Sequence, residues 1–286
     1  MKIMVTGALG NVGGYVASDL IEMNQEIVVA DINLDKLDER YGETASAVYF
    51  DFMDPKTYDK ALEGVDRVFI MRPPHIGNPE DMYPFIEKMK EKDIQLVSFL
   101  SLMGIENNTI PPHYKIEKKI EAVGLPFSHI RPGFFMQNVS GVHSVEIREM
   151  DKIYVPAGRS TTMLVDAADI GLAVATVLAN HKVHQNTAYT ISGPKAMDYY
   201  EIADILSDIT GRKITYAKPG FLKYRHQYRK VRGLEAGYVN VTMALYLMTR
   251  LDKKNKTATK DFEILTGKKH RDFRTFAEAN KEAFMA

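Results

Sequence analysis

The stretch that decides the predicted fold is TGALGNVGG, residues 6–14. Its three glycines, Gly7, Gly10 and Gly13, follow the short apolar segment KIMVT, residues 2–6. Gly7 permits a sharp turn, Gly10 lets a ligand approach the backbone, and Gly13 lets the next helix pack closely on the strand. A strand–turn–helix unit presents free amides and the positive end of a helix dipole to phosphate. We therefore predict a dinucleotide site here, against the alternative of a plain tight turn.

An acidic residue ends the second expected strand, EIVVA over residues 26–30. Asp31 lies about 20 residues after the turn, where a carboxylate accepts hydrogen bonds from ribose hydroxyls and repels a 2′-phosphate. Its position favours NAD over NADP, and the alternative is that it caps the helix expected near Asn33. Asp51 is left open between contacting the adenine amino group and capping the next turn. The adjacent Phe52 is a further candidate cofactor contact.

Short apolar segments alternate with longer amphipathic ones through the first half of the chain. The expected strands cover residues 2–6, 26–30, 47–50, 67–70, 96–100 and 126–130, and the helices cover 11–23, 33–40, 55–63, 79–92 and 113–123. Strands that are apolar throughout and alternate with helices indicate a parallel sheet covered on both faces. We predict an α/β chain with a Rossmann-type, doubly wound parallel sheet, whose dinucleotide-binding lobe spans residues 1–150.

The pattern changes in the second half of the chain. Residues 151–286 are mostly helical, with Met, Tyr and Leu at helical spacing, and they predict a smaller C-terminal lobe that binds the substrate. One segment, TAYTIS over residues 187–192, has the apolar character of a buried strand. It is a candidate to return to the main sheet.

Composition narrows the function classes. The chain has 286 residues, no net charge and no cysteine. Neutral charge argues against a general nucleic-acid binder, and the lack of cysteine excludes disulfides, thiolate metal sites and a cysteine nucleophile. Asp166 and Asp169 are interpreted as the start of a helix, so no metal site is predicted. Without a signal peptide or a long apolar run, we expect a cytoplasmic monomer or homodimer that binds a small molecule.

Several further segments resemble one family, the NmrA-like branch of the atypical short-chain dehydrogenases/reductases. They are TGALGNVG (6–13), VYFDFMDP (48–55), GVDRVFIMRPP (64–74), GLPFSHIRPGFFMQN (124–138), VDAADIG (165–171), TAYTISGPKAMDYYEIADILSDITGRKITY (187–216) and DFEILTGKKHRDFRTFAEAN (261–280). The resemblance covers most of the chain. It implies a dinucleotide lying across the carboxyl ends of the strands.

The resemblance also implies the residues that contact the cofactor. It assigns Gly7, Leu9, Gly10, Asn11 and Val12 to the pyrophosphate and Met71 and Arg72 to the length of the cofactor. It places the loop Pro132–Phe135, including Pro132 and Phe134, near the nicotinamide. Many relatives carry an arginine just after the second strand and prefer NADP. This chain has Asp31 there instead, so the expected cofactor is NAD or NADP, with NAD favoured unless Lys36 or Arg40 reaches a 2′-phosphate.

Candidate catalytic groups surround the helix expected at residues 113–123. Tyr114 and Lys118 share one helix face, and Ser101 precedes them, as in the serine–tyrosine–lysine arrangement of ordinary short-chain dehydrogenases. A lysine ammonium can lower the pKa of a tyrosine that donates a proton. The alternative is an ordinary charged helix surface. His113 is the other candidate proton donor, since a histidine ordinarily titrates near neutrality.

The sequence as a whole predicts a reductase that passes hydride from NAD(P)H to a small quinone or carbonyl acceptor. A non-catalytic sensor of the NAD(P) redox state is the alternative, and it would need a protein partner. A nucleotide-sugar epimerase ranks third, because the second lobe shows no pattern typical of a diphosphate clamp.

Overall fold

The structure is a computed structural model that describes every residue except 253 and 255. The chain forms two compact units, each assembled from separate stretches of sequence. The first unit contains residues 1–132, 167–191 and 260–269, and the second contains 133–166, 192–259 and 270–286.

A seven-stranded sheet organises the first unit, in the order β10-β6-β5-β4-β1-β2-β3. Its strands are β1 (Lys2–Thr6), β2 (Glu26–Asp31), β3 (Ser46–Tyr49), β4 (Val65–Met71), β5 (Leu96–Leu100), β6 (Phe127–Pro132) and β10 (Thr187–Ile191). Every neighbouring pair is parallel. The predicted doubly wound parallel sheet is therefore confirmed, and each predicted strand lies within a few residues of its observed position.

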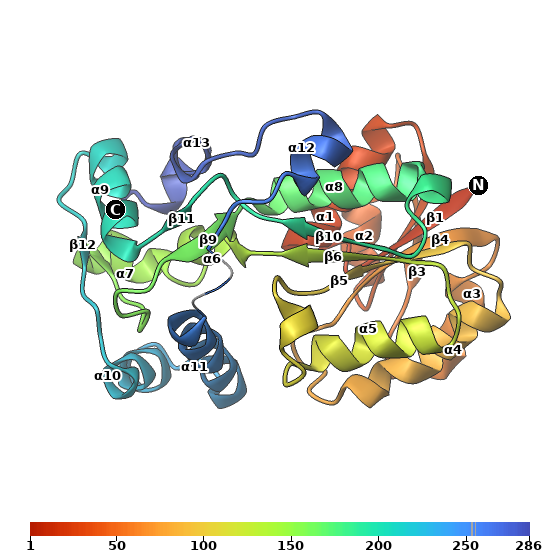
Figure 1. Ribbon diagram of the computed structural model, residues 1–286, viewed down its shortest axis with the longest axis horizontal. Helices are drawn as coiled ribbons and strands as arrows, with labels where there is room; N and C mark the ends of the chain where they lie inside the picture. The colour runs from red at the N-terminus through yellow and green to blue at the C-terminus, as the bar shows by residue number, and fades with distance from the viewer. Residues whose placement is uncertain (253, 255) are drawn as a thin grey trace. The chain divides into compact units, whose positions relative to one another are not determined.

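Helices cover both faces of this sheet. They are α1 (Asn11–Glu22), α2 (Leu34–Tyr41), α3 (Tyr58–Ala61), α4 (Tyr83–Glu91), α5 (Pro112–Ala122), α8 (Ala167–Ala179) and α12 (Asp261–Thr266), with short 3₁₀ turns at Pro55–Thr57, Pro79–Met82, Ile105–Asn107 and His181–Val183. Figure 1 shows α1 and α8 on one face and α3, α4 and α5 on the other. Short connections return each helix antiparallel to its strand, so the parallel strands all end at one edge.

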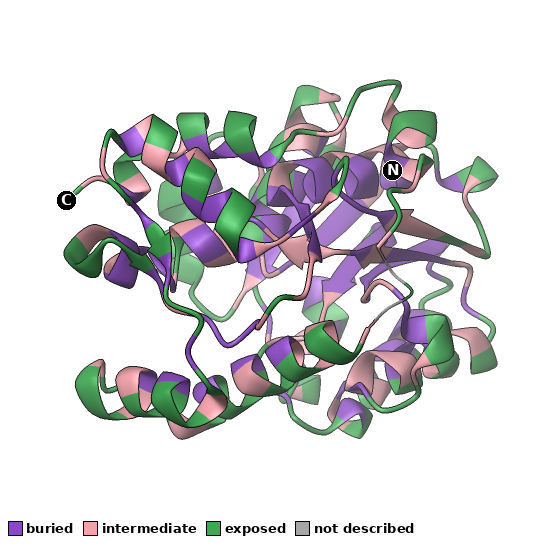
Figure 2. Cartoon of the chain, turned by 60° about the vertical axis from the view of Figure 1, so that its left-hand side comes forward, coloured by how far each residue is buried: buried purple, intermediate pink, exposed green. Residues whose placement is uncertain are grey.

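The core explains why these apolar segments become central strands. Figure 2 shows the strands of this sheet mostly in the buried colour, with exposed residues on the outer sides of the helices. Between the sheet and α3–α5, an aromatic cluster joins Phe50, Phe52, Tyr58 and Phe85, with ring centroids of Phe50 and Phe85 4.6 Å apart. Buried strands on both faces have no polar side to alternate with, which is why they appear as continuous apolar runs.

The boundary between the units differs from the single division expected after residue 150. The strand Thr187–Ile191 pairs with β6 in the main sheet, and α8 also belongs to the first unit. Helix α8 belongs to the first unit because it packs closely on α1. A β-carbon at Gly171 of α8 would lie 2.4 Å from the β-carbon of Tyr15 on α1. The second unit instead begins at residue 133, so the chain crosses between units several times.

The second unit is smaller in its sheets and richer in helices. Its strands are β7 (Phe134–Phe135), β8 (Lys152–Ile153), β9 (Thr162–Val165), β11 (Ala196–Met197) and β12 (Thr215–Tyr216). Its helices are α6 (Gln137–Ser140), α7 (Ser144–Met150), α9 (Tyr199–Thr210), α10 (Phe221–His226), α11 (Ala236–Leu251) and α13 (Phe273–Ala279), with a π-helical turn at Gln227–Val231 and a 3₁₀ turn at Lys281–Ala283. The strands form two small sheets, β11-β9-β7 and β12-β8.

A buried histidine joins the helices of the second unit. The two ring nitrogens of His143 lie 2.7 Å from the hydroxyls of Tyr228 and Tyr246, and Tyr228 donates to Glu146 at 3.2 Å. These tyrosines, noted for their helical spacing, are therefore packing residues with satisfied hydroxyls. Among the described residues, no helix combines the length and the apolar character needed to cross a membrane.

Candidate functional site

The glycine turn between β1 and α1 has the geometry that the sequence predicts. Gly7 lies at a φ of +62°, in the left-handed region that favours glycine, and its amide donates to the carbonyl of Ala30 at 2.9 Å. A β-carbon at Gly13 would lie 2.3 Å from the carbonyl oxygen of Gly7. Any side chain at position 13 would thus force α1 away from the turn.

The first turn of α1 is open to a ligand. Gly10 is the N-cap residue, and no side chain accepts a hydrogen bond at this end. The first amides of a helix have no partner within the helix, so they and the helix dipole favour an anion. A β-carbon at Gly10 would lie 3.2 Å from the carbonyl oxygen of Gly7 and would cover this cradle. These features fit a pyrophosphate.

The residues next to Gly10 differ in what they offer. Asn11 is exposed and Leu9 is half-buried, whereas Val12 is only 1% exposed. The side chain of Val12 packs in the core, so its contribution to a ligand would come from the backbone.

The turn lies at the switch point of the sheet. β1 has β2 on one side and β4 on the other, and the strand order reverses between β1 and β4. Ligands of open α/β sheets bind in the crevice outside the carboxyl ends of the strands at such a point. The end of β4 packs closely against the turn. A β-carbon at Gly7 would lie 2.8 Å from the sulfur of Met71. Met71 therefore borders the turn from the neighbouring strand.

Asp31 ends β2 and does not cap the next helix. The helix cap of α2 is Asn33, whose side chain accepts from the amide of Lys36 at 3.1 Å. One carboxylate oxygen of Asp31, Oδ1, accepts from the amide of Ile32 at 2.8 Å, and the side chain is partly exposed. The capping alternative is thus excluded, and the carboxylate keeps lone pairs for a ribose.

Asp51 and Phe52 have local structural roles. Oδ1 of Asp51 accepts from the amide of Met53 at 2.8 Å, which stabilises the turn after β3. Phe52 is 6% exposed and packs edge-on against Phe50, with ring centroids 4.7 Å apart. The carbonyl of Phe52 accepts from the hydroxyl of Tyr58 at 2.5 Å. The ring of Phe52 is therefore a core residue and is not available to a cofactor.

Arg72 follows β4 and is held by its own loop. Its Nη1 donates to the carbonyls of Pro73 and Ile76. Its buried Nε has no hydrogen-bond partner among the described residues. Burial lowers the pKa of Arg72, which remains a cation. An immobilised cation beside the carboxyl end of β4 adds positive potential at this edge of the sheet.

His113 lies at the start of α5 and is neutral. Its ring stacks on Phe99, with centroids 6.0 Å apart, and its buried Nδ1 has no hydrogen-bond partner among the described residues. Burial and the nearby Arg72 lower its pKa to about 3, against the opposing effect of Glu117. The prediction that this histidine titrates near neutrality is therefore wrong. A neutral imidazole can donate a hydrogen bond, but it is not an imidazolium acid at neutral pH.

A buried ion pair lies one turn further along α5. Arg131 on β6 donates to both carboxylate oxygens of Glu117, from Nε at 3.0 Å and from Nη2 at 2.7 Å. Burial tends to raise the pKa of Glu117, but the bonds from Arg131 and the other polar neighbours together outweigh it, and the pKa lies below its usual value. Ser101 is 1% exposed, and its hydroxyl also helps to keep that pKa low. Ser101 therefore lies beside a carboxylate.

Tyr114 and Lys118 share a helix face, as predicted. The ammonium of Lys118 lies over the ring of Tyr114, 5.9 Å from its centroid, and bonds the carboxylate of Glu121 at 2.6 Å. That bond raises the pKa of Lys118 and outweighs burial, which lowers it. The ammonium is therefore paired with a carboxylate and stacked on a ring face.

The last two predicted contacts fall on either side of the unit boundary. Pro132 ends β6, is buried, and accepts the amide of Met103 at 2.9 Å. Phe134 belongs to the second unit, where its ring centroid lies 5.5 Å from that of Tyr246.

Sequence reasoning missed the buried role of Glu117. The charged face expected for α5 included this residue, but its side chain is 1% exposed. The sequence does contain a signal for the burial of Glu117. Glu117 lies between Ile116 and Ile120, which are both fully buried, and Arg131 is a charged residue within a largely buried strand. A charge inside each of two buried elements indicates that the two charges form a pair.

One hollow of the first unit lies away from the glycine turn. It measures about 600 Å³ and lies at the start of β4, lined among others by Lys60, Gly64, Asp66 and Lys92. This is the amino edge of the sheet, opposite the edge where α/β sheets bind dinucleotides.

The chain is similar to several known proteins along nearly its whole length. The "Prestalk A differentiation protein A" of Dictyostelium discoideum is 35% identical, over 99% of this chain and 93% of its own. The "NAD(P)H azoreductase" of Xenophilus azovorans is 28% identical, over 99% of each chain. Among solved structures, an NADPH-dependent quinone oxidoreductase of Escherichia coli complexed with NADPH superposes with a TM-score of 0.85 at 20% identity, covering 99% of this chain and 100% of its own.

The family itself is shown by a match along most of the sequence. The model of the NmrA-like family matches residues 1–257, which include the glycine turn, α5 and most of the second unit. Together with the 35% identity to the Dictyostelium protein, this match confirms the resemblance. The chain belongs to the NmrA-like family.

Proposed function

We propose that the chain is an NAD(P)H-dependent reductase of a small quinone or carbonyl acceptor. The observation that carries the proposal is the turn between β1 and α1. Its side-chain-free N-cap at Gly10, the left-handed Gly7 and the tight approach at Gly13 fit a pyrophosphate at the switch point of a parallel sheet. Two similar proteins are named as an azoreductase and a quinone oxidoreductase, and these activities support the acceptor class.

The arrangement on α5 favours an acceptor that needs little help from a protein acid. Hydride would pass from the reduced nicotinamide to the acceptor, which then carries two more electrons and takes up a proton. His113 is neutral, and Lys118 is bonded to Glu121. A reduced quinone is a stable anion that can take its proton from water, whereas a simple ketone needs an acid. Quinones are therefore the preferred class, with Tyr114 as the one remaining donor on this face.

We further propose that NADH is preferred over NADPH. The carboxylate of Asp31 stands at the end of β2, where it would accept from ribose hydroxyls and repel a 2′-phosphate. Arg40 does not offset it at that position, because its guanidinium packs beside Gly14 on α1 and over the ring of Tyr41. The side chain of Lys36 is exposed.

The test is a steady-state assay of NADH oxidation with a panel of soluble quinones, azo compounds and ketones. Gly10→Ala is the test variant, since a methyl group there would block the pyrophosphate without requiring a strained backbone. Gly77→Ala is the matched control, because a β-carbon at Gly77 would meet nothing within 4 Å. Quinone-dependent turnover that is lost in Gly10→Ala and kept in Gly77→Ala supports the proposal.

One observation favours the redox sensor as the second candidate. The ammonium of Lys118 is engaged by Glu121 at 2.6 Å, so the Tyr114–Lys118 pair is not arranged as a tuned acid. A sensor requires different affinities for the oxidised and reduced cofactor, because equal affinities shift no equilibrium. Nucleotide binding with a strong preference for one redox form, and no turnover with any acceptor, would favour this function over the reductase.

A further inference from the structure

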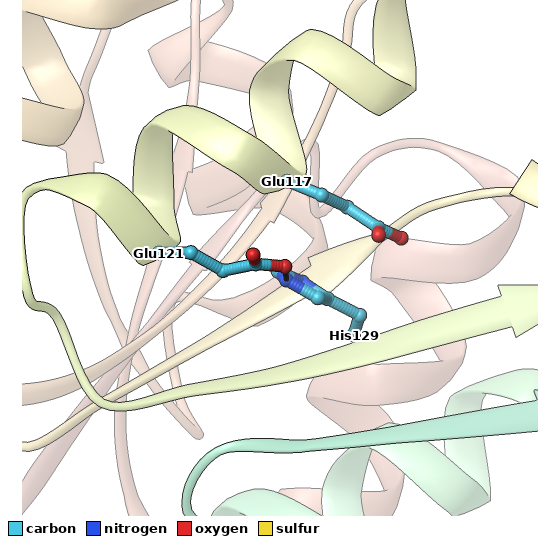
Figure 3. Close-up of side chains that lie close together, drawn as sticks. All are labelled: Glu117, Glu121 and His129. Carbon is cyan, nitrogen blue, oxygen red and sulfur yellow. Dashed lines mark ion pairs between the residues drawn. The ribbon is translucent and has the colours of Figure 1, made fainter. Parts of the chain in front are cut away.

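A second polar cluster joins the C-terminal half of α5 to β6. Figure 3 shows Glu117 and Glu121 projecting from one side of α5, with the carboxylate of Glu121 against the imidazole of His129 on β6. One ligand atom from each of the three side chains lies within 4.8 Å of the others. From this cluster we propose that Glu117, Glu121 and His129 bind one divalent transition-metal ion of the Zn²⁺ type. The proposal is independent of the reductase function.

The unsatisfied imidazole of His129 is the first observation in support. His129 is 0% exposed, and neither of its ring nitrogens has a hydrogen-bond partner among the described residues. Buried polar atoms without partners are rare and costly. The ring is held by apolar neighbours, stacked on Phe127 at 4.4 Å and edge-on to Phe99 at 6.2 Å between centroids. A bound ion would satisfy one nitrogen without moving the ring.

The spacing of the donors is the second observation. Nε2 of His129 lies 3.4 Å from Oε1 of Glu121. This is long for a charge-assisted hydrogen bond, but two ligands of a tetrahedral Zn²⁺ ion at about 2.1 Å stand about 3.4 Å apart. The third donor is a carboxylate oxygen of Glu117, which lies within 4.8 Å of the other two ligand atoms. A water molecule would complete the tetrahedron.

The net charge around the three side chains is compatible with a bound cation. Arg131 bonds Glu117, but it also has a second carboxylate partner in Glu106, at 3.2 Å from its Nη1. Lys118 bonds Oε2 of Glu121, which leaves Oε1 toward the histidine. The three glutamates and the two cations sum to one negative charge, so a divalent ion would not add to an existing positive excess. Arginine and lysine bonds to the ligating carboxylates would act as outer-shell contacts.

The mixed donor set selects the kind of ion. Imidazole nitrogen suits Zn²⁺ and its neighbours, whereas Mg²⁺ and Ca²⁺ prefer oxygen ligands alone. The side chain of Glu121 is 28% exposed and gives the ion a route from solvent. An ion here would tie α5 to β6.

The experiment is a titration of Zn²⁺ against a chromogenic chelator, using full-length protein first stripped with EDTA. We expect one Zn²⁺ per chain, with Mg²⁺ failing to compete. Glu121→Gln and His129→Gln should each weaken binding at least about 10-fold, the range seen when metal shells are altered. The control is Glu87→Gln, which removes an exposed carboxylate that pairs with Lys119 but faces no histidine.

Two results would overturn the proposal. One is the absence of a stoichiometric site in the wild-type protein. The other is binding that persists in both variants, which would assign the zinc to surface histidines. His129→Gln alters a buried position and could prevent folding. In that case Glu121→Gln alone tests whether these side chains bind the zinc. A rise in the melting temperature of the wild type with Zn²⁺, absent in Glu121→Gln, is the second supporting readout.

Discussion

The glycine turn and helix α5 lie in the same unit, yet they convey function in opposite ways. At the turn, the backbone forms the candidate site. Gly7, Gly10 and Gly13 have no side chains, so the amides and the dipole of α1 are left to face a phosphate. On α5, the chemistry depends on ionisable side chains, and their neighbours determine whether each one is charged. His113 is neutral because its ring is largely shielded from water and lies near Arg72, and Glu117 is ionised because Arg131 bonds it. A backbone site can thus be recognised from spacing, whereas a side-chain site needs its surroundings.

The largest effect is expected from breaking the buried pair on α5. Glu117→Gln leaves the guanidinium of Arg131 with the exposed Glu106 as its one carboxylate partner and should lower the free energy of unfolding by about 3 kcal/mol. Urea denaturation in the presence of EDTA measures it. The control Glu87→Gln should change stability by less than about 0.5 kcal/mol, because the pair it removes is exposed. Equal effects in the two variants would show that burial does not distinguish Glu117.

The turn should respond to a single methyl group. In Gly13→Ala the new β-carbon would lie 2.3 Å from the carbonyl oxygen of Gly7, a backbone atom that cannot rotate away. We expect a loss of about 2 kcal/mol in unfolding free energy, typical of overpacking. Thermal unfolding of Gly13→Ala beside Gly77→Ala checks this. If the two variants melt together, the close approach of α1 to the turn is not a constraint.

The pH dependence of His113 sharpens the contrast. In the unfolded chain its ring takes up a proton near 6.5, but in the folded chain only near 3. The unfolded state therefore binds more protons between these values, and stability falls as the pH drops below about 6.5, by up to about 1.4 kcal/mol per pH unit. His113→Gln should reduce the slope of stability with pH by this amount and leave the contributions of the other buried histidines. NMR of the wild-type ring should show it neutral down to about pH 4. A midpoint between 6 and 7 would restore His113 as a candidate acid.

The smallest effects are expected at Tyr114 and Lys118. Lys118→Met removes an exposed ion pair with Glu121 and should change stability by less than about 0.5 kcal/mol. Tyr114→Phe should slow quinone reduction far less than the roughly 10²–10⁴-fold contribution of a general acid. Steady-state kinetics with a quinone and a ketone compares the two acceptor types. A loss of that size with the quinone would show that Tyr114 is the proton donor despite the placement of Lys118.

The elements that were predictable share a physical feature. The strands and the turn follow from apolar runs and from glycine, whose effects are local. The domain boundary was not predictable, because α8 joins the first unit through close packing at Gly171, which involves residues far apart in sequence. The cluster of Glu117, Glu121 and His129 was not predicted for the same reason. Helical spacing places the two glutamates on one face of α5, but His129 joins them only because β6 packs beside α5 in the fold.

The most direct test of the central claim is a calorimetric titration of NAD⁺, NADH, NADP⁺ and NADPH into the wild type, Gly10→Ala and Asp31→Ala. We predict micromolar binding of NADH to the wild type and weaker binding of NADPH. Gly10→Ala should lose at least roughly 10-fold in affinity, about 1.4 kcal/mol, and Asp31→Ala should bind NADPH more tightly. If none of the four nucleotides binds the wild type, TGALGNVGG is only a structural turn, and the reductase and sensor functions both fail.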